Sequence, residues 1–258
     1  MPQGKWSLPA GVRIEYKDVM RNLKLTIEYD GADFSGWQVQ TDRRTIQGEL
    51  LRVFAELAEG DVRIIGAGRT DAGVHAVGQV ANVQLNTGHS LDVIRKAVNA
   101  KLPDTILVRK VEEADLSFHA RYDAKSRSYR YIYITKPTAL WKKYYHYTGG
   151  PVDVDAMRKA VKELYGYDDF SSFATAGDTR STWCRVTRAE LLENEPLLTI
   201  SLKADRFLYN MVRTIAGTVL EIGRGKDLNI REIIEARDRR AAGPVLSPSA
   251  LYFMEVEY

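Results

Sequence analysis

Apolar and polar residues alternate strictly along the segment 23–30, with apolar side chains at Leu23, Leu25, Ile27 and Tyr29. A period of two residues is typical of a strand that buries one face. After a loop at 31–40, apolar residues recur at helical spacing from Ile46 to Leu57. This spacing predicts an amphipathic helix that ends before Gly60.

Similar patterns continue to residue 111. Two strands flank a glycine-rich stretch at 66–80, a helix covers about 91–102 and ends at Pro103, and a strand follows near 105–111. The first half therefore has the order strand, helix, strand, strand, helix, strand.

The second half predicts the same order of elements without any repeat of residues. The predicted strands are 128–135, 185–192, 197–203 and 251–258, and the predicted helices are 154–165, 206–222 and a short one at 230–238. Each half has the βαββαβ order of a ferredoxin-like unit. We predict an α+β fold in which two such halves, each with an antiparallel or mixed sheet, join side by side around a central cleft. The expected organisation is an extension at 1–22, an N-terminal half at 23–115 and a C-terminal half at 116–258.

Composition narrows the class of protein. A hydrophobic content of 45% with 28% charged residues is typical of a globular chain, and the net charge of +3 is too small to indicate an anionic partner by itself. Cys184 is the single cysteine, which excludes an intrachain disulfide and fits a reducing cytoplasm. The four histidines lack metal-ligand spacing, so we predict no metal. No signal peptide or bilayer-spanning stretch is apparent, and we expect a cytoplasmic protein with no membrane contact.

The stretch 66–80 concentrates the candidate chemistry. Asp71 lies among four glycines on a short connection that is held at both ends by strands. A carboxylate held in this way can act as a nucleophile. The alternative is a turn or helix-capping aspartate, the commoner role of aspartate in such a loop. A phosphate-binding role for the glycines has less support, because the run lacks a Lys-Ser/Thr ending and leads into a strand.

Basic and aromatic side chains alternate over 121–136. The cations are Arg121, Lys125, Arg127, Arg130 and Lys136, and the rings are Tyr122, Tyr129, Tyr131 and Tyr133. Rings beside cations suit single-stranded or looped RNA, because bases stack on aromatic faces while arginines meet phosphates. Alternatively, the tyrosines of the strand cover the half-buried face of a sheet.

The predicted helix at 206–222 has a second, polar stripe. Arg206, Asn210, Arg213 and Gly217 follow spacings of four, three and four and would share one face. A guanidinium on that face could point into the groove between the halves. The alternative is an ordinary solvated face.

Taken together, these stretches resemble the tRNA pseudouridine synthase A family. The matching segments are Tyr29–Gln38, Gly66–His75, Phe118–Tyr122, Ser128–Tyr131 and Phe207–Arg213. The resemblance extends from about Leu23 to Tyr258 and departs from the family pattern in the first 22 residues and at Ala250. It implies the pseudouridine synthase fold and isomerisation of uridine to pseudouridine at positions 38 to 40 of the tRNA anticodon stem-loop. It also implies that no cofactor is used and that the protein is a homodimer.

The resemblance also implies roles for individual residues. Asp71 would be the catalytic nucleophile, Arg213 the cation beside it, and Tyr129 the tyrosine that stacks on the flipped uracil and moves a proton. Arg69 would hold the opened RNA. The matching segments further suggest substrate contacts for His75, Phe118, Arg121 and Asn210. The competing interpretation is a non-catalytic RNA-binding protein in which Asp71 is only a turn residue.

Overall fold

The computed structural model describes residues 20–58, 61–175 and 181–258. The N-terminal half contains β1 (Met20–Tyr29), α1 (Ile46–Ala55), β2 (Arg63–Gly66), β3 (His75–Asn86), α2 (Leu91–Lys101) and β4 (Ile106–Ala114). Most of the expected N-terminal extension lies outside the described residues. Its last three residues, 20–22, were wrongly assigned to it, because they form the start of β1.

The C-terminal half begins with β5 and ends with β10. Its elements are β5 (Ser126–Ile134), β6 (His146–Tyr147), α3 (Val154–Lys162), β7 (Gly166–Asp169), β8 (Trp183–Asn194), β9 (Leu197–Ala204), α4 (Met211–Gly223), α5 (Ile230–Ala236) and β10 (Leu251–Glu257). The short strands β6 and β7 were not predicted. The α+β architecture with two βαββαβ halves is confirmed.

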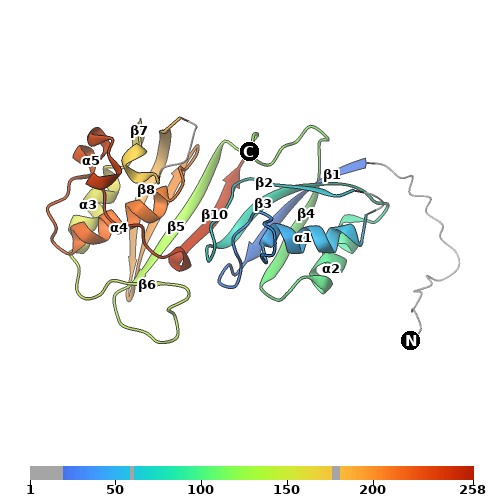
Figure 1. The fold of residues 1–258 in the computed structure, drawn as a ribbon, viewed down its shortest axis with the longest axis horizontal. Coiled ribbons are helices and arrows are strands. Elements are labelled where there is room, and N and C mark those ends of the chain that lie inside the picture. Colours follow the sequence, from blue (N-terminus) through green and yellow to red (C-terminus); the bar gives the residue numbers. More distant parts are fainter. Residues whose placement is uncertain (1–19, 59–60, 176–180) are drawn as a thin grey trace, which may run out of the picture.

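The strands of both halves form one continuous sheet in the order β4-β1-β3-β10-β5-β9-β8-β7, with β2 paired to β3 and β6 to β5 (Figure 1). Within each half the four main strands follow the same spatial order, β4-β1-β3-β2 and β10-β5-β9-β8, and pair antiparallel. The halves meet where β10 runs parallel to the start of β3, pairing Tyr252 with His75 and Phe253 with Ala76. We call this pairing the seam.

Two hydrophobic cores lie between the sheet and the helices. In Figure 1, α1 and α2 lie over the N-terminal strands, while α3, α4 and α5 lie at the C-terminal ones. Phe253 of β10 belongs to the N-terminal core, and Val74 from the connection before β3 belongs to the C-terminal core. Because each half buries a side chain from the other side of the seam, the halves are joined by packing as well as by backbone pairing.

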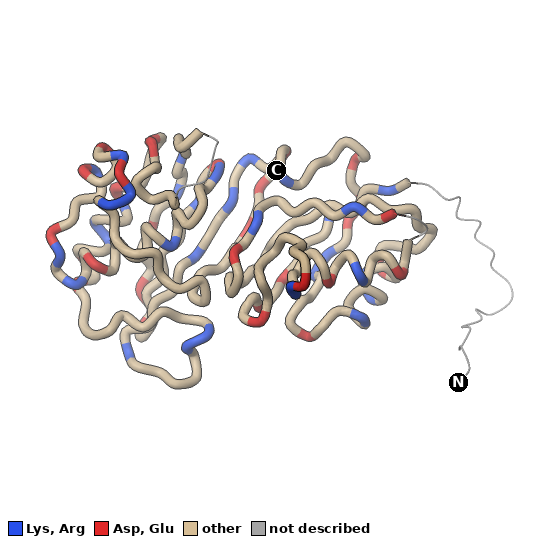
Figure 2. Tube along the Cα trace, viewed as in Figure 1, with Lys and Arg blue, Asp and Glu red and all other residues tan. Residues whose placement is uncertain are grey.

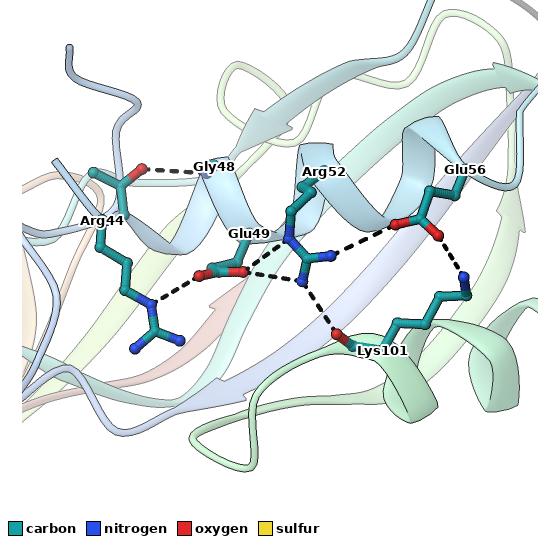
Figure 3. A network of polar contacts seen from close by, with 7 residues as sticks. Arg44, Gly48, Glu49, Arg52, Glu56 and Lys101 are labelled. Atoms are coloured by element: carbon teal, nitrogen blue, oxygen red, sulfur yellow. Dashed lines mark hydrogen bonds and ion pairs between the residues drawn. The ribbon is translucent and has the colours of Figure 1, made fainter. Parts of the chain in front are cut away.

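Trp37 packs inside the N-terminal half, and a network of ion pairs runs along the exposed side of α1. The Trp37 indole is fully buried, and a Cβ at Gly66 would lie 2.6 Å from its ring. On the exposed side of α1, Glu49 pairs with Arg44 and Arg52, and Arg52 also donates to the Lys101 carbonyl of α2 at 3.1 Å (Figure 3). Exposed ion pairs stabilise little, so this network orients α1 against α2 more than it holds the fold.

The predicted helix at 206–222 begins later than expected. It starts at Met211 because Asn210, at its N-cap, has a left-handed φ of 62°. Residues 206–209 are therefore a connection, and the predicted helical stripe from Arg206 to Gly217 does not form. Gly217 instead lies against the Pro244 backbone, where a Cβ would come within 1.9 Å of the carbonyl oxygen.

Two of the three tyrosines of the predicted RNA-stacking row are core residues. Tyr131 and Tyr133 are fully buried and donate to the carbonyls of Ser247 and Ala216, at 3.0 and 2.8 Å. The stacking hypothesis is wrong for these two rings, because helix α4 and its neighbours cover this part of β5. Arg130 alternates with these tyrosines along β5, so it lies on the opposite face of the sheet, where it borders a separate cavity of about 470 Å³.

Among the described helices, none is long and apolar enough to cross a lipid bilayer.

Candidate active site

A cavity of about 1090 Å³ opens between the two halves. One wall consists of β2 and the loop that follows it, residues 63–71. The other consists of the connection before α4 and the first turn of that helix, residues 206–213. Tyr129 of β5 lies between them. Ligand cavities commonly measure about 300–1000 Å³, so this one is large enough for a nucleotide together with flanking backbone.

Asp71 and Arg213 face each other across this cavity. Arg213 Nη1 lies 3.1 Å from Asp71 Oδ2, and their side chains are 16% and 33% exposed. Within the described residues, the protein donates no hydrogen bond to Oδ1 of Asp71. Arg213 therefore holds one carboxylate oxygen of Asp71 and leaves the other available to a ligand.

The Arg213 guanidinium is fixed by two further acceptors. Its Nε donates to the Leu246 carbonyl at 2.7 Å, and its Nη1 donates to Asn210 Oδ1 at 2.8 Å. Asn210 is itself held, because its Nδ2 donates to Thr175 Oγ1 at 2.9 Å. A planar guanidinium with three such acceptors has one orientation, and that orientation points Nη1 at Asp71.

Buried side chains beneath the Asp71 loop determine its shape. Tyr29 and Thr70 share a hydrogen bond of 2.7 Å between their hydroxyls, and Gln79 Nε2 donates to the Gly68 carbonyl at 2.9 Å. The backbone of Trp37 donates to the Thr70 carbonyl at 3.0 Å. Strands β1 and β3 thus hold the residues on either side of Arg69 and immediately before Asp71.

Tyr129 presents its ring to the cavity between two phenylalanines. Phe207 and Phe253 contact it edge to face, with centroids 5.0 and 4.9 Å away. Burial raises the pKa of Tyr129 far above its ordinary value, and the negative charge of Asp71 raises it further. The phenol is therefore protonated at neutral pH and serves as a hydrogen-bond donor.

The cavity is strongly basic although the chain as a whole is nearly balanced. Among the described residues, six arginines line it against the one carboxylate of Asp71: Arg63, Arg69, Arg121, Arg127, Arg206 and Arg213. Figure 2 shows that Lys and Arg are otherwise interspersed with Asp and Glu over the chain. Arg69 is oriented by Gln38 Oε1, which accepts from its Nε at 3.1 Å. Such a cleft favours a polyanion, whose phosphates meet the guanidiniums while the carboxylate faces the ligand.

Six of the eight predicted site residues line the cavity: Arg69, Asp71, Arg121, Tyr129, Asn210 and Arg213. His75 and Phe118 do not. His75 is 3% exposed and stacks on Tyr252, with Nδ1 beside the Gly31 amide and Asp30, while Nε2 donates to the carbonyls of Lys143 and Ser249. Phe118 packs on Tyr258. Both side chains belong to the scaffold, so the prediction that they contact substrate is not supported.

Sequence reasoning missed the residues that hold the site. Arg63 and the hydrogen-bonded set of Tyr29, Thr70 and Gln79 received no role, because each lies in a strand or loop pattern that only indicates packing. Arg127 was noted as one cation among several. Within the described residues, no cluster of three or more His, Cys, Asp or Glu side chains could hold a metal ion.

Comparison with known proteins gives consistent matches. A family model described as tRNA pseudouridine synthase matches residues 25–123 and 160–258. The tRNA pseudouridine synthase A of Acetivibrio thermocellus is 41% identical over 244 residues, covering 93% of this chain and 100% of that protein. That of a Geobacillus species, strain WCH70, is 42% identical over 245 residues, covering 92% and 98%. Among solved structures, the archaeal box H/ACA sRNP Nop10-Cbf5 complex matches 85% of this chain and 59% of that chain at 13% identity. Its TM-score of 0.34 is too low to carry functional meaning.

Proposed function

Because this chain belongs to the tRNA pseudouridine synthase A family, and is therefore an enzyme that isomerises uridine in tRNA, we propose that it acts at positions 38 to 40 of the anticodon stem-loop with Asp71 as its nucleophile. The observation that carries the proposal is the Asp71–Arg213 pair, 3.1 Å apart, inside a cavity lined by six arginines.

The reaction defines what the cavity must do. The bond from ribose C1′ to N1 breaks, the uracil turns, and a bond from C1′ to C5 forms, while C5 loses a proton and N1 gains one. Atoms and electrons balance without an oxidant, a reductant or a co-substrate. A covalent adduct with the carboxylate divides this change into easier steps. Attack at uracil C6 holds the base on the enzyme, whereas attack at ribose C1′ holds the ribose while the released uracil turns inside the cavity.

A uridine in a stem reaches Asp71 only after it leaves the helix, which costs a few kcal/mol. The arginines that line the cavity offset this cost, because each phosphate that they meet adds a favourable, salt-dependent contact. Arg69, which lines the cavity two residues before Asp71, would hold the RNA where the uridine has left the stack.

The roles of the remaining groups follow from their surroundings. Arg213 holds the Asp71 carboxylate in place, since the position of the guanidinium is itself fixed by Leu246 and Asn210. Tyr129 stacks on or donates to the flipped uracil. Burial raises the pKa of Tyr129, so the phenol is protonated and its hydroxyl can donate a hydrogen bond that orients the base.

We further propose that the enzyme is a cytoplasmic homodimer in which one tRNA touches both subunits. The exposed side chains of Leu140 and Trp141, between β5 and β6, offer an apolar surface for a second copy. The chain has one cysteine, Cys184, and therefore no intrachain disulfide, which fits a reducing compartment. Sedimentation of the wild-type protein should give the mass of two chains, and a monomer would contradict this part of the proposal.

Conversion of unmodified tRNA transcripts tests the main proposal. The purified protein should form pseudouridine without added metal or nucleotide, and carbodiimide-dependent reverse-transcription stops should map it to the anticodon arm. Asp71→Asn should abolish conversion while retaining tRNA binding. Asp42→Asn is the matched control, because Asp42 is an exposed loop residue at a left-handed φ that asparagine also adopts. Stops outside the anticodon arm, or conversion by Asp71→Asn, would contradict the assignment.

A further inference from the structure

Arg127 of β5 makes an unusual set of contacts beside the cavity. Its Nη1 donates to the carbonyls of Ala124 and Asp205 at 3.1 and 2.9 Å, and its Nη2 donates to those of Ala67 and Arg121 at 3.1 and 2.6 Å. Four of the five N–H donors of one guanidinium are thus bound to backbone oxygens. In the described part of the chain, Arg127 has no ion pair with a carboxylate.

These four carbonyls belong to the three segments that surround the cavity. Ala67 leads into the loop of Asp71, Arg121 and Ala124 lie between β4 and β5, and Asp205 begins the connection that ends at Asn210, directly before α4. One side chain therefore joins the nucleophile loop of the N-terminal half to the α4 approach of the C-terminal half.

The segment between β4 and β5 is tied to the N-terminal strands by buried hydrogen bonds. Asn22 of β1 and Asn82 of β3, both fully buried, make these bonds. Asn22 Nδ2 donates to the carbonyls of Asp115 and Phe118 at 2.8 and 2.9 Å, and Asn82 Oδ1 accepts from the Ala120 amide at 3.0 Å. Displacement of either wall relative to this segment must stretch a hydrogen bond of Arg127.

The four carbonyl acceptors leave the positive charge of the Arg127 guanidinium unneutralised. A carboxylate partner would neutralise the guanidinium, whereas carbonyls orient it and leave a full positive charge in a cavity that receives phosphates. Burial lowers the pKa of Arg127, but an arginine side chain stays protonated in proteins.

We propose that Arg127 is a positioning residue that clamps the two walls of the cleft and thereby holds Asp71 in register with Arg213 and the flipped uridine. This inference rests on the proposed function. The planar fork is essential, because a lysine ammonium presents three donors from one point and does not span four carbonyls in three segments. Misplacement of reacting groups by about 1 Å costs roughly 100-fold in rate.

Arg127→Lys and Arg127→Gln, each assayed well below its melting temperature, should lower kcat on tRNA by about 10- to 100-fold and change KM by less than about threefold. Amide hydrogen exchange at 67–71, 121–124 and 205–210 should become faster in both variants. Arg21→Gln is the matched control. Arg21 also donates to backbone carbonyls, those of Thr87 and His89, and pairs with Glu113, but it lies outside the cavity. The Arg21→Gln substitution should lower the melting temperature and leave kcat unchanged.

If both Arg127 variants keep the wild-type amide hydrogen-exchange rates and the wild-type kcat, the proposed clamping role of Arg127 is wrong. An equal loss of kcat in Arg21→Gln would also overturn it, because general destabilisation would then explain the effect. If the wild-type protein converts no uridine, the proposed function fails, whereas hydrogen exchange still decides whether Arg127 joins the three segments. Should Arg127→Gln not fold, Arg127→Lys alone provides both measurements.

Discussion

Replacing Arg213 by lysine separates charge from geometry at the centre of the site. The arginine makes three hydrogen bonds, of 2.7 Å to Leu246, 2.8 Å to Asn210 and 3.1 Å to Asp71. A lysine keeps the positive charge, but its ammonium lacks the spaced donors needed to reach all three acceptors at once. If it pairs with Asp71 it loses the two contacts that aim it, and the carboxylate then samples unproductive positions.

A displacement of about 1 Å costs roughly 100-fold in rate, which corresponds to about 2.7 kcal/mol in the transition state. We therefore expect Arg213→Lys to lower kcat about 100-fold in a single-turnover assay with saturating tRNA. The dissociation constant of tRNA should change little, because five other cavity arginines remain. Arg224→Lys is the matched control at the other end of α4, where the arginine bonds Thr148 and Glu221.

Two results would refute this reasoning. A wild-type kcat in Arg213→Lys would mean that charge alone suffices at this position. A weakened tRNA affinity with unchanged kcat would mean that Arg213 binds the RNA backbone and does not position Asp71.

Two further predictions concern the scaffold. Burial raises the pKa of Tyr29 to about 12 against about 10 in the unfolded chain, so its contribution is complete below pH 10 and is lost as pH rises towards 12, by about 1.4 kcal/mol for each pH unit. Urea midpoints between pH 9 and 11.5 should accordingly fall less steeply in Tyr29→Phe than in the wild type, and parallel slopes would contradict the assignment. Gly78→Ala should destabilise the seam by about 1–3 kcal/mol, since its Cβ would lie 2.4 Å from the Met254 carbonyl oxygen; an unchanged calorimetric melting temperature would show that the seam adjusts freely.

The order and type of the main elements could be predicted because each half carries its pattern locally. Alternation in 23–30 predicted β1, and helical spacing from Ile46 predicted α1. The seam between β3 and β10 joins residues far apart in the chain, and no local pattern specifies which strand edges meet. The start of α4 was placed too early for a related reason, because Leu208 continues the apolar spacing although Asn210 interrupts the helix with a left-handed backbone.

The sequence predicts site residues that lie in distinctive segments. It does not show which side chains of a strand are buried in the core and which reach the cavity. Tyr129, Tyr131 and Tyr133 share one face of β5, yet only Tyr129 reaches the cavity, since the other two lie in the core under α4. His75 lies four residues from Asp71 in sequence and still points into the scaffold. Which of these neighbours faces the ligand depends on tertiary packing that periodicity does not encode.

The position of β10 in the seam has a consequence for biosynthesis. This strand pairs with β3 on one edge and β5 on the other, and it is translated after every other strand of the sheet. The N-terminal half can collapse on the ribosome while its partner is still being made. The two halves can pair at the seam only after β10 has emerged, so the cavity between them is incomplete in shorter nascent chains.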